Sequence, residues 1–230
     1  VLAVKPQNNQ IGFVHIGKTA GTQIKILIDY INKRGPSKKL IGLKHYCKLD
    51  GLMHPHYFFS IRQPIARFKS AFYARKREDQ PTYKNPHTKN EAMAFKEFNH
   101  ANELAEALFS EDRGYKALCA MQAVGHLARQ QVDWIVREGY FLEKSPPIWI
   151  IRQENFNADF ETFLNRADIG VNISDIDLTP NSVKAHISTY SGIEEIDFSK
   201  KAKDNLKNWY ARDFEFYKHC DAWLNNGGKL

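Results

Sequence analysis

The stretch IGFVHIGKTAGTQIKIL, residues 11–27, limits what this chain can fold into more than any other part of the sequence. Its first six residues, 11–16, are mostly apolar, aromatic or β-branched, which is typical of a buried strand. Residues 22–34 then carry apolar side chains at the spacing of one helical face, and Gly35-Pro36 ends that helix. A strand, a short loop and a helix in this order predict the first βα unit of a parallel sheet.

Later segments continue the alternation of strands and helices. The expected elements are a strand at 56–61, a helix from 64 to about 77, a polar loop at 78–90, two or three helices in 91–138, a strand at 147–154, a helix at 156–166, an irregular stretch at 168–198 and a helix at about 199–224. This order predicts an α/β protein with a P-loop-like three-layer fold, in which helices flank a central parallel sheet. A single domain over residues 1–230 is expected, with two smaller domains as the alternative.

Basic residues outnumber acidic residues in this chain. There are 33 Lys and Arg against 26 Asp and Glu, which gives a formal net charge of +7. An excess of this size favours anionic ligands such as phosphates, sulfates, acidic sugars or nucleic acid, without choosing among them. Hydrophobic residues make up 43% of the chain, which is enough for a packed core and argues against disorder.

Cysteine usage and hydropathy narrow the class of protein further. The three cysteines, Cys47, Cys119 and Cys220, form no C-x-x-C pair, which argues against a zinc site or a redox dithiol, and no metal is expected. No apolar run reaches the ~18 residues of a membrane span, so no membrane segment is expected. The polar N-terminal stretch VLAVKPQNNQ does not read as a signal peptide and favours a cytoplasmic protein, although a trimmed lumenal Golgi-type domain would look the same.

Gly12, Gly17, Lys18 and Thr19 match the phosphate-loop pattern G-x-x-x-x-G-K-[ST] of nucleotide hydrolases and kinases. In such a loop the four residues after the first glycine leave the strand. Here residues 13–16 are bulky and alternate like a strand, so the loop must be shorter. Neither later strand ends in an aspartate that could hold magnesium. The literal match is therefore weak evidence for a nucleoside triphosphate site.

The shorter loop, residues 17–22, still predicts an anion site. Backbone N–H groups at a helix start are unsatisfied, and the helix dipole adds about half a positive charge there. Lys18 supplies a full charge, and Thr19 and Thr22 supply hydroxyl groups; the alternative is that one of these threonines only caps the helix.

The second strand also ends in a cation. Arg62 follows that strand directly, Pro64 begins the next helix, and Ser70 lies two turns into it. A guanidinium group binds phosphate or sulfate with two hydrogen bonds. Because ligands of parallel sheets bind at the carboxyl ends of the strands, two cationic strand ends predict two anion sites at one edge.

Taken together, these motifs resemble the PAPS-dependent sulfotransferases, closest to the membrane-type and carbohydrate enzymes such as heparan sulfate 2-O-sulfotransferase and bacterial relatives. The resemblance rests on FVHIGKTAGT, which is similar to the family's 5′-phosphosulfate loop HIPKTAGT, and on IRQPIARFKSAFY, which is similar to its 3′-phosphate motif RDPxxRxxSxYY. Further similar segments are IWIIRQENFNADFETFLNR at 148–166, PNSVK at 180–184 and WYARDFEFY at 209–217. Two residues depart from the family pattern: Gly17 replaces a proline, and Gln63 replaces an aspartate.

The resemblance implies that the chain is a sulfotransferase (EC 2.8.2 class) with 3′-phosphoadenosine 5′-phosphosulfate (PAPS) as donor and no metal. It implies that Lys18 and the loop Gly17, Lys18, Thr19, Ala20, Gly21 and Thr22 hold the 5′-phosphate, and that Arg62 and Ser70 hold the 3′-phosphate. Lys18 would also stabilise charge on the bridging oxygen in the transition state. Lys184 is a further candidate for the nucleotide, as is Ser182. The acceptor is expected to be a hydroxyl group, on a glycan or on a small metabolite or lipid alcohol.

An acceptor hydroxyl needs a general base, and histidine suits neutral pH. His45 is the expected base, because GLKHYCKL resembles the segment where family members place a catalytic histidine. His54 and His56 are expected at a strand entrance, and His15 is expected to be packed inside. Glu154, after the third predicted strand, is the substitute.

Other functions stay open from the sequence. The literal match to the phosphate-loop pattern leaves a Walker-A-type kinase or NTPase as an alternative. The positive net charge leaves a nucleic-acid-binding module as another, although no motif of that class is present and no nucleic acid is expected. A sulfotransferase fold used only for binding is a further alternative. The basic cluster ARKRED, residues 74–79, is expected to be a solvated helix end or a guide for an anionic glycan.

Overall fold

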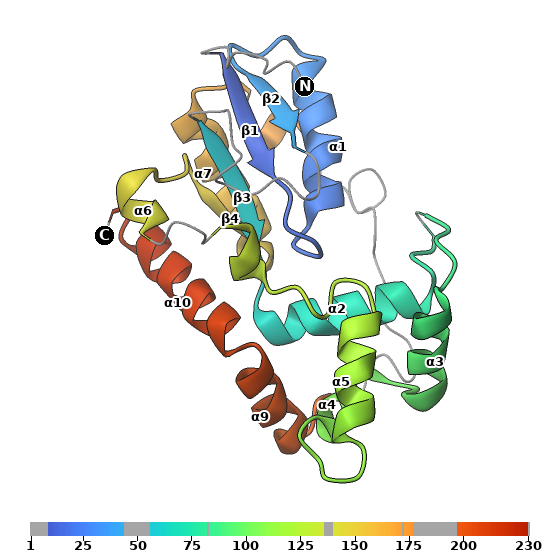
Figure 1. The fold of residues 1–230 in the computed structure, drawn as a ribbon. Coiled ribbons are helices and arrows are strands. Elements are labelled where there is room, and N and C mark those ends of the chain that lie inside the picture. Colours follow the sequence, from blue (N-terminus) through green and yellow to red (C-terminus); the bar gives the residue numbers. More distant parts are fainter. Residues whose placement is uncertain are drawn as a thin grey trace, which may run out of the picture. The chain divides into compact units, whose positions relative to one another are not determined.

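A computed structural model describes residues 9–43, 56–81, 83–135, 140–171, 173–176 and 197–229 of the chain (Figure 1). The chain divides into two compact units. Unit 1 comprises residues 1–62, 131–185 and 216–230, and unit 2 comprises residues 63–130 and 186–215. The expectation of one domain over residues 1–230 stays a prediction.

Unit 1 is built on a four-stranded parallel sheet (Figure 1). Its strands are β1 (Gln10–Val14), β2 (Lys39–Gly42), β3 (Tyr57–Ile61) and β4 (Ile150–Arg152), in the order β2-β1-β3-β4. Every pairing between neighbours is parallel. The carboxyl ends of all the strands therefore lie at one edge of the sheet, as the α/β prediction requires.

Helices flank this sheet. Those of unit 1 are α1 (Gly21–Asn32), α6 (Phe141–Lys144), α7 (Phe156–Ala167) and the part of α10 (Ala211–Asn225) from residue 216 onward, with 3₁₀ turns at Gln131–Trp134, Gln153–Asn155 and Ile173–Asp175.

Adjacent side chains of β3 show which helix covers which face of the sheet. Phe58 stacks on Phe163 of α7, with ring centroids 4.0 Å apart, whereas Phe59 stacks on Phe216 of α10, with centroids 6.3 Å apart. Successive strand residues point to opposite faces, so α7 and α10 cover opposite faces. The predicted fold class, a parallel sheet between helical layers, is confirmed.

Unit 2 is helical where the structure describes it. Its helices are α2 (Pro64–Lys76), α3 (Lys89–Glu97), α4 (Ala101–Ala107), α5 (Gly114–Ala123) and α9 (Lys200–Trp209). They enclose a second hydrophobic core that includes Phe68, Phe72, Phe98, Leu104, Met121, Leu206 and Tyr210. Unit 2 thus has a core of its own, made of side chains from all five helices or their ends.

Among the described residues the expected elements correspond closely to the observed ones, except that the short helix α6 and strand β2 were not expected and the last helix is divided. The expected irregular stretch at 168–198 lies mostly outside the described residues. Strand β2 was not expected, because KLIG is short and has one fully buried side chain, Leu40. The expected helix at 199–224 is two helices, α9 and α10, which meet at Tyr210. The Tyr210 side chain at this junction is buried and donates a hydrogen bond to the carbonyl of Leu127, 2.7 Å away.

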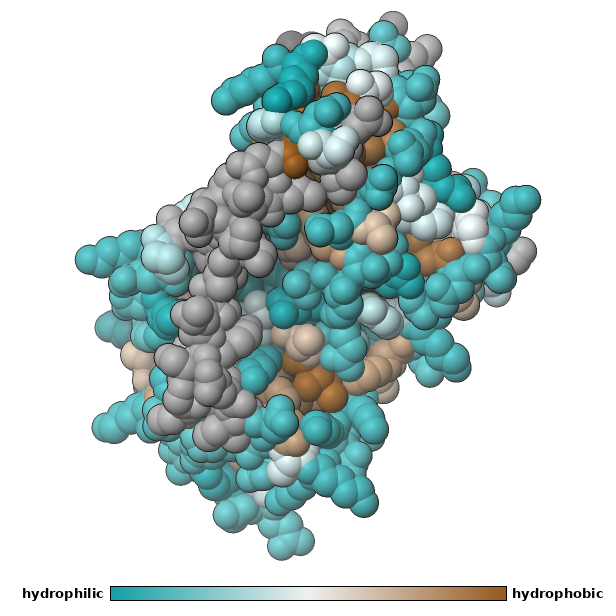
Figure 2. Space-filling view, turned by 180° about the vertical axis from the view of Figure 1, so that it is seen from behind, coloured by the Kyte–Doolittle hydropathy of each residue, from teal (hydrophilic) through white to brown (hydrophobic). Residues whose placement is uncertain are grey.

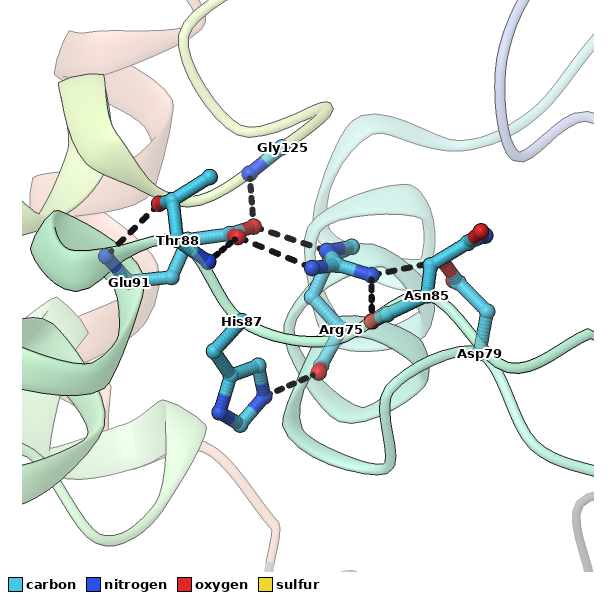
Figure 3. A network of polar contacts seen from close by, with 7 residues as sticks. All are labelled: Arg75, Asp79, Asn85, His87, Thr88, Glu91 and Gly125. Atoms are coloured by element: carbon cyan, nitrogen blue, oxygen red, sulfur yellow. Dashed lines mark hydrogen bonds and ion pairs between the residues drawn. The ribbon is translucent and has the colours of Figure 1, made fainter.

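The basic cluster at 74–79 contains a buried ion pair (Figure 3). Arg75 donates to both carboxylate oxygens of Glu91, at 2.7 and 2.8 Å, and a third bond reaches Asp79. Glu91 also accepts from the backbone N–H groups of Thr88 and Gly125. Arg75 is therefore a structural residue of unit 2, and the expectation of a solvated cation is wrong at this position.

The face drawn in Figure 2 is largely hydrophilic with scattered hydrophobic areas. The large hydrophobic side chains that are exposed among the described residues are Ile26, Tyr83, Met93, Phe109, Tyr115, Leu118 and Tyr140. No helix in the described part of the chain has the length and apolar character needed to cross a membrane.

Candidate anion-binding site

The loop between β1 and α1 has the backbone shape of an anion cradle. Strand β1 ends at Val14 and helix α1 begins at Gly21. Between them, Lys18 and Ala20 both have left-handed backbone angles, with φ of 69° and 70°. Left-handed residues in a tight turn direct neighbouring N–H groups to the same side, which creates a concave site for an anion. Non-glycine residues adopt this conformation at a cost of about 1–2 kcal/mol, which is typical of functional loops.

No side chain at the N-cap or in the first turn of α1 neutralises the partial positive charge of the backbone N–H groups there. Its N-cap residue is Ala20, which has no side-chain oxygen to cap the helix, and its first turn contains no acidic residue. The first intrahelical bond runs from the N–H of Ile24 to the carbonyl of Ala20, 3.0 Å away. The N–H groups of residues 21–23 therefore lie outside the helical ladder and have the orientation that binds anions.

Thr19 secures the loop from below. Its side chain is fully buried, and its hydroxyl donates to the carbonyl of Ile16 at 2.8 Å. Because a hydroxyl has one proton, the 2.9 Å contact with the Ser60 hydroxyl must have Ser60 as donor. The expectation that the Thr19 hydroxyl faces a ligand is therefore corrected: the hydroxyl holds the loop against β3, and only the backbone N–H of Thr19 is left for an anion. Thr22 is half-buried in the first turn of α1.

Gly21 is required by the side chain above it. A Cβ atom at this position would lie 1.9 Å from Nε2 of His15. The imidazole ring is stacked on Phe13, with centroids 5.7 Å apart, so it has little freedom to move. His15 is thus a packing residue, as expected. Because Gly21 has no side chain, α1 can begin directly against the His15 ring.

The phosphate-loop match does not form an extended loop. Gly12 lies inside β1, where it pairs with Ile41 of β2 and Tyr57 of β3. The residues after it, Phe13 and Val14, continue the strand and are fully buried. The connection between β1 and α1 therefore comprises residues 15–20, so the expected loop at 17–22 begins two residues too late and includes the first two residues of α1.

Arg62 follows β3 directly, on the strand that pairs with β1. Its backbone is held by Gln131, a residue that the sequence analysis missed. The side-chain oxygen of Gln131 accepts from the Arg62 N–H at 2.9 Å, and its amide nitrogen donates to the Arg62 carbonyl at 2.7 Å. Gln131 is fully buried. No local sequence pattern predicts that Gln131 binds the backbone of Arg62, because the two residues are far apart in the sequence.

Gln63 caps the helix that follows Arg62. It is the N-cap of α2, and its side-chain oxygen accepts from the N–H of Ala66 at 2.9 Å. An amide oxygen fulfils this role as a carboxylate would. Ser70 lies half-buried in α2 and belongs to unit 2, whereas Arg62 belongs to unit 1, so their joint role stays a prediction.

The end of β4 carries charged side chains of both signs. Arg152 makes a two-point bond to the buried carboxylate of Asp159, at 2.8 and 2.9 Å, and another to Asp221. These hydrogen bonds raise the pKa of the Arg152 guanidinium. Glu154 is exposed just beyond and accepts a 3.2 Å hydrogen bond from the hydroxyl of Tyr217. Burial, with the nearby charge of Glu154, raises the pKa of Tyr217, so this hydroxyl stays protonated.

The described candidates of unit 1 gather at one sheet edge. The loop containing Lys18 follows β1, Arg62 follows the neighbouring β3, and Glu154 follows β4 beside it. Adjacent strands lie about 4.8 Å apart, so the loop and Arg62 are close neighbours. His45 and Lys184, with His54 and Ser182, lie outside the described residues, and His56 is exposed just before β3.

No known family model, curated protein or solved structure matches this chain. Within the residues that the structure describes, no group of three or more His, Cys, Asp or Glu side chains is placed to hold a metal ion. The interpretation of the site therefore depends on its own geometry and on the sequence motifs.

Proposed function

We propose that this protein is a PAPS-dependent sulfotransferase that transfers a sulfuryl group to an acceptor hydroxyl. The observation that carries the proposal is the 2.9 Å contact between the hydroxyls of Thr19 and Ser60. It joins the anion cradle after β1 to β3, two residues before Arg62. Two cationic sites on neighbouring strands suit a ligand with two separate anionic groups, which a nucleotide with 5′- and 3′-phosphates has.

The residues present fit such a donor. The N–H groups of the loop 17–22 and the Lys18 ammonium would hold the 5′-phosphosulfate, and the Arg62 guanidinium would hold the 3′-phosphate, with Ser70 as the predicted second contact. The absence of acidic residues from the first turn of α1 supports this assignment, because no carboxylate there repels the ligand.

The chemistry needs a base and a group that accepts developing charge. The acceptor oxygen bonds to sulfur while the bond from sulfur to the 5′-phosphate oxygen breaks, the acceptor proton passes to the base, and the 3′,5′-bisphosphate leaves. Lys18 lies in the loop that would meet this leaving oxygen, where its charge stabilises the transition state. His45 is the proposed base, and Glu154 is the alternative among the described residues.

A Walker-A-type kinase or NTPase is the second candidate. The literal sequence match favours it, but the position of Gly12 within β1 does not, since the next two residues, Phe13 and Val14, continue the strand. The acceptor is proposed to be a glycan or a small metabolite, because both offer hydroxyl groups and the basic chain attracts acidic sugars.

Thermal unfolding with added nucleotide tests the proposal. We expect adenosine 3′,5′-bisphosphate to raise the melting temperature, since a ligand at a hundred times its Kd stabilises by about 2.7 kcal/mol. Lys18→Ala and Arg62→Ala are expected to abolish most of this shift, and Lys25→Ala, an exposed lysine of α1, is the control of equal charge. A shift with magnesium-ATP and none with the bisphosphate would favour the kinase. Sulfate transfer from PAPS to a set of hydroxyl acceptors then tests the activity itself.

A further inference from the structure

Gln131 holds Arg62 through both polar groups of its backbone. The amide of Gln131 accepts from the Arg62 N–H at 2.9 Å and donates to the Arg62 carbonyl at 2.7 Å. The Gln131 side chain is fully buried, where water cannot replace these bonds. Loss of either partner in such a place costs the full desolvation of the group left behind, so the pairing is strongly favoured.

The position of Arg62 explains why such a clamp matters. Arg62 is the first residue after the end of β3 and the last residue of unit 1 before the chain passes into unit 2. Gln131 is the first residue after the chain returns. A residue beyond a strand end has lost the sheet hydrogen bonds that fix its backbone, and the Gln131 amide replaces them with two bonds of similar length.

We propose that Gln131 is a positioning residue that makes the nucleotide site selective for a 3′-phosphate. This inference rests on the proposed function, in which Arg62 holds that phosphate. A guanidinium group binds phosphate with two parallel hydrogen bonds, and this geometry depends on the direction of the backbone that carries it. A backbone fixed before binding loses less conformational freedom when the ligand arrives.

The two halves of the proposed site are held by different contacts, which makes the inference testable. The 5′ cradle is fixed by Thr19, through Ile16 and Ser60. Neither contact involves Gln131. A change at Gln131 is therefore expected to weaken recognition of the 3′-phosphate while it leaves recognition of the 5′-phosphate nearly unchanged.

The experiment compares two nucleotides on the full chain. Calorimetric titration gives the Kd of adenosine 3′,5′-bisphosphate and of adenosine 5′-monophosphate for wild type and Gln131→Glu. This variant keeps the size of the side chain and can still accept from the Arg62 N–H, but in its ionised form it has no proton for the Arg62 carbonyl. Because burial favours the protonated form of a carboxyl group, Gln131→Met, which removes the donor at every pH, is titrated beside it. We expect bisphosphate affinity to fall about tenfold, the loss expected for one charge-assisted interaction, and monophosphate affinity to change less than about twofold.

A matched control exists in the same unit. Asn32 clamps the backbone of Leu40 in the same way, donating to its carbonyl at 2.7 Å and accepting from its N–H at 3.0 Å. Leu40 lies near the start of β2, at the opposite end of the strands from Arg62. Asn32→Asp makes the same chemical change as Gln131→Glu and is expected to lower stability without altering the ratio of the two affinities.

The ratio of the two affinities also separates positioning from folding. Partial unfolding lowers the amount of binding protein equally for both nucleotides, so the ratio does not depend on the folded fraction. Gln131→Met, which removes both polar groups, provides a second variant with the same expectation. If wild type prefers the bisphosphate and both Gln131 variants retain that preference, the inference is wrong while the proposed function stands. If wild type binds neither nucleotide, the proposed function itself fails.

Discussion

The hydroxyl groups of Thr19 and Ser60 lie 2.9 Å apart in the buried interior, at the point where the loop after β1 meets β3. Ser60 donates this bond, because Thr19 has already given its proton to the carbonyl of Ile16. A threonine that the sequence suggests as a ligand contact is therefore a support for the loop. The contact joins the loop after β1 to β3, the strand that Arg62 follows directly.

Replacement of Thr19 by valine tests this support. Valine keeps the shape of the side chain but leaves the Ile16 carbonyl and the Ser60 hydroxyl without their partner. We expect the free energy of unfolding to fall by about 1–3 kcal/mol, the cost of buried polar groups left unpaired. Urea unfolding measures the change. Thr19→Ser retains the hydroxyl and is expected to restore most of the stability, whereas Thr22→Val, on the half-buried neighbour, is expected to cost little.

Substitution of Gly21 by alanine is expected to destabilise the protein, although alanine normally favours a helix over glycine. The new Cβ would lie 1.9 Å from the His15 ring, and overpacking of this kind costs about 1–3 kcal/mol. Gly42→Ala is the matched control, because its Cβ would meet only the flexible Lys25 side chain, at 3.9 Å. Thermal unfolding of both variants measures the difference. His15→Ala in the Gly21→Ala background is expected to recover stability, and failure to do so would show that the clash is not the cause.

The Arg75–Glu91 ion pair makes stability depend on pH. Burial by itself raises the pKa of Glu91, but hydrogen bonds from Arg75 and from the N–H groups of Thr88 and Gly125 outweigh it and lower the pKa to about 2. A carboxyl with a depressed pKa in the folded state stabilises the fold above its ordinary pKa of 4.5, and this contribution is lost as the pH falls toward 2. We expect Glu91→Gln to destabilise unit 2 by about 3–5 kcal/mol near pH 7, the usual cost of breaking a buried pair from one side.

Denaturant unfolding at about pH 3 and about pH 7 measures how the free energy of unfolding depends on pH. The difference between wild type and Glu91→Gln is expected to shrink as the pH falls below 4.5, because Glu91 then binds a proton in the unfolded chain but not yet in the folded protein. Glu111→Gln, at an exposed acid of unit 2, serves as control and is expected to change stability little at any pH. A constant difference across the range would mean that the carboxylate charge of Glu91 is not what stabilises the pair.

The identity of the general base follows from comparing turnover with nucleotide affinity. If His45 is the base, His45→Ala is expected to lower kcat by about 10²–10⁴-fold while the Kd of adenosine 3′,5′-bisphosphate stays unchanged. Glu154→Gln is then expected to leave kcat within a few fold. The reverse pattern would assign the base to Glu154, and Tyr217→Phe, which removes its 3.2 Å hydrogen bond, would then alter the pH profile of kcat.

Local patterns are sufficient for much of the architecture. Apolar runs and helical periodicity predicted β1, β3 and β4 and the helices that follow them, because each segment buries side chains at the period of its own secondary structure. The short strand β2 escaped notice, since a strand of four residues with one buried side chain leaves too weak a pattern. The division at Tyr210 was not predicted either, since the helical hydrogen bonds continue on both sides of it and the sequence there contains no helix-breaking residue.

The candidate site likewise has features that local sequence predicts and features that only the tertiary structure shows. Residues 11–62 by themselves determined that a short loop and an arginine follow two strands of a parallel sheet, since loop length and strand ends are local properties of the chain. Only the tertiary structure decided that the Thr19 hydroxyl faces inward to Ile16 and Ser60, and that Gln131 holds Arg62 from sixty-nine positions away. Hydrogen bonds between distant residues depend on which side chains the packed core brings together, and no pattern within one segment carries that information.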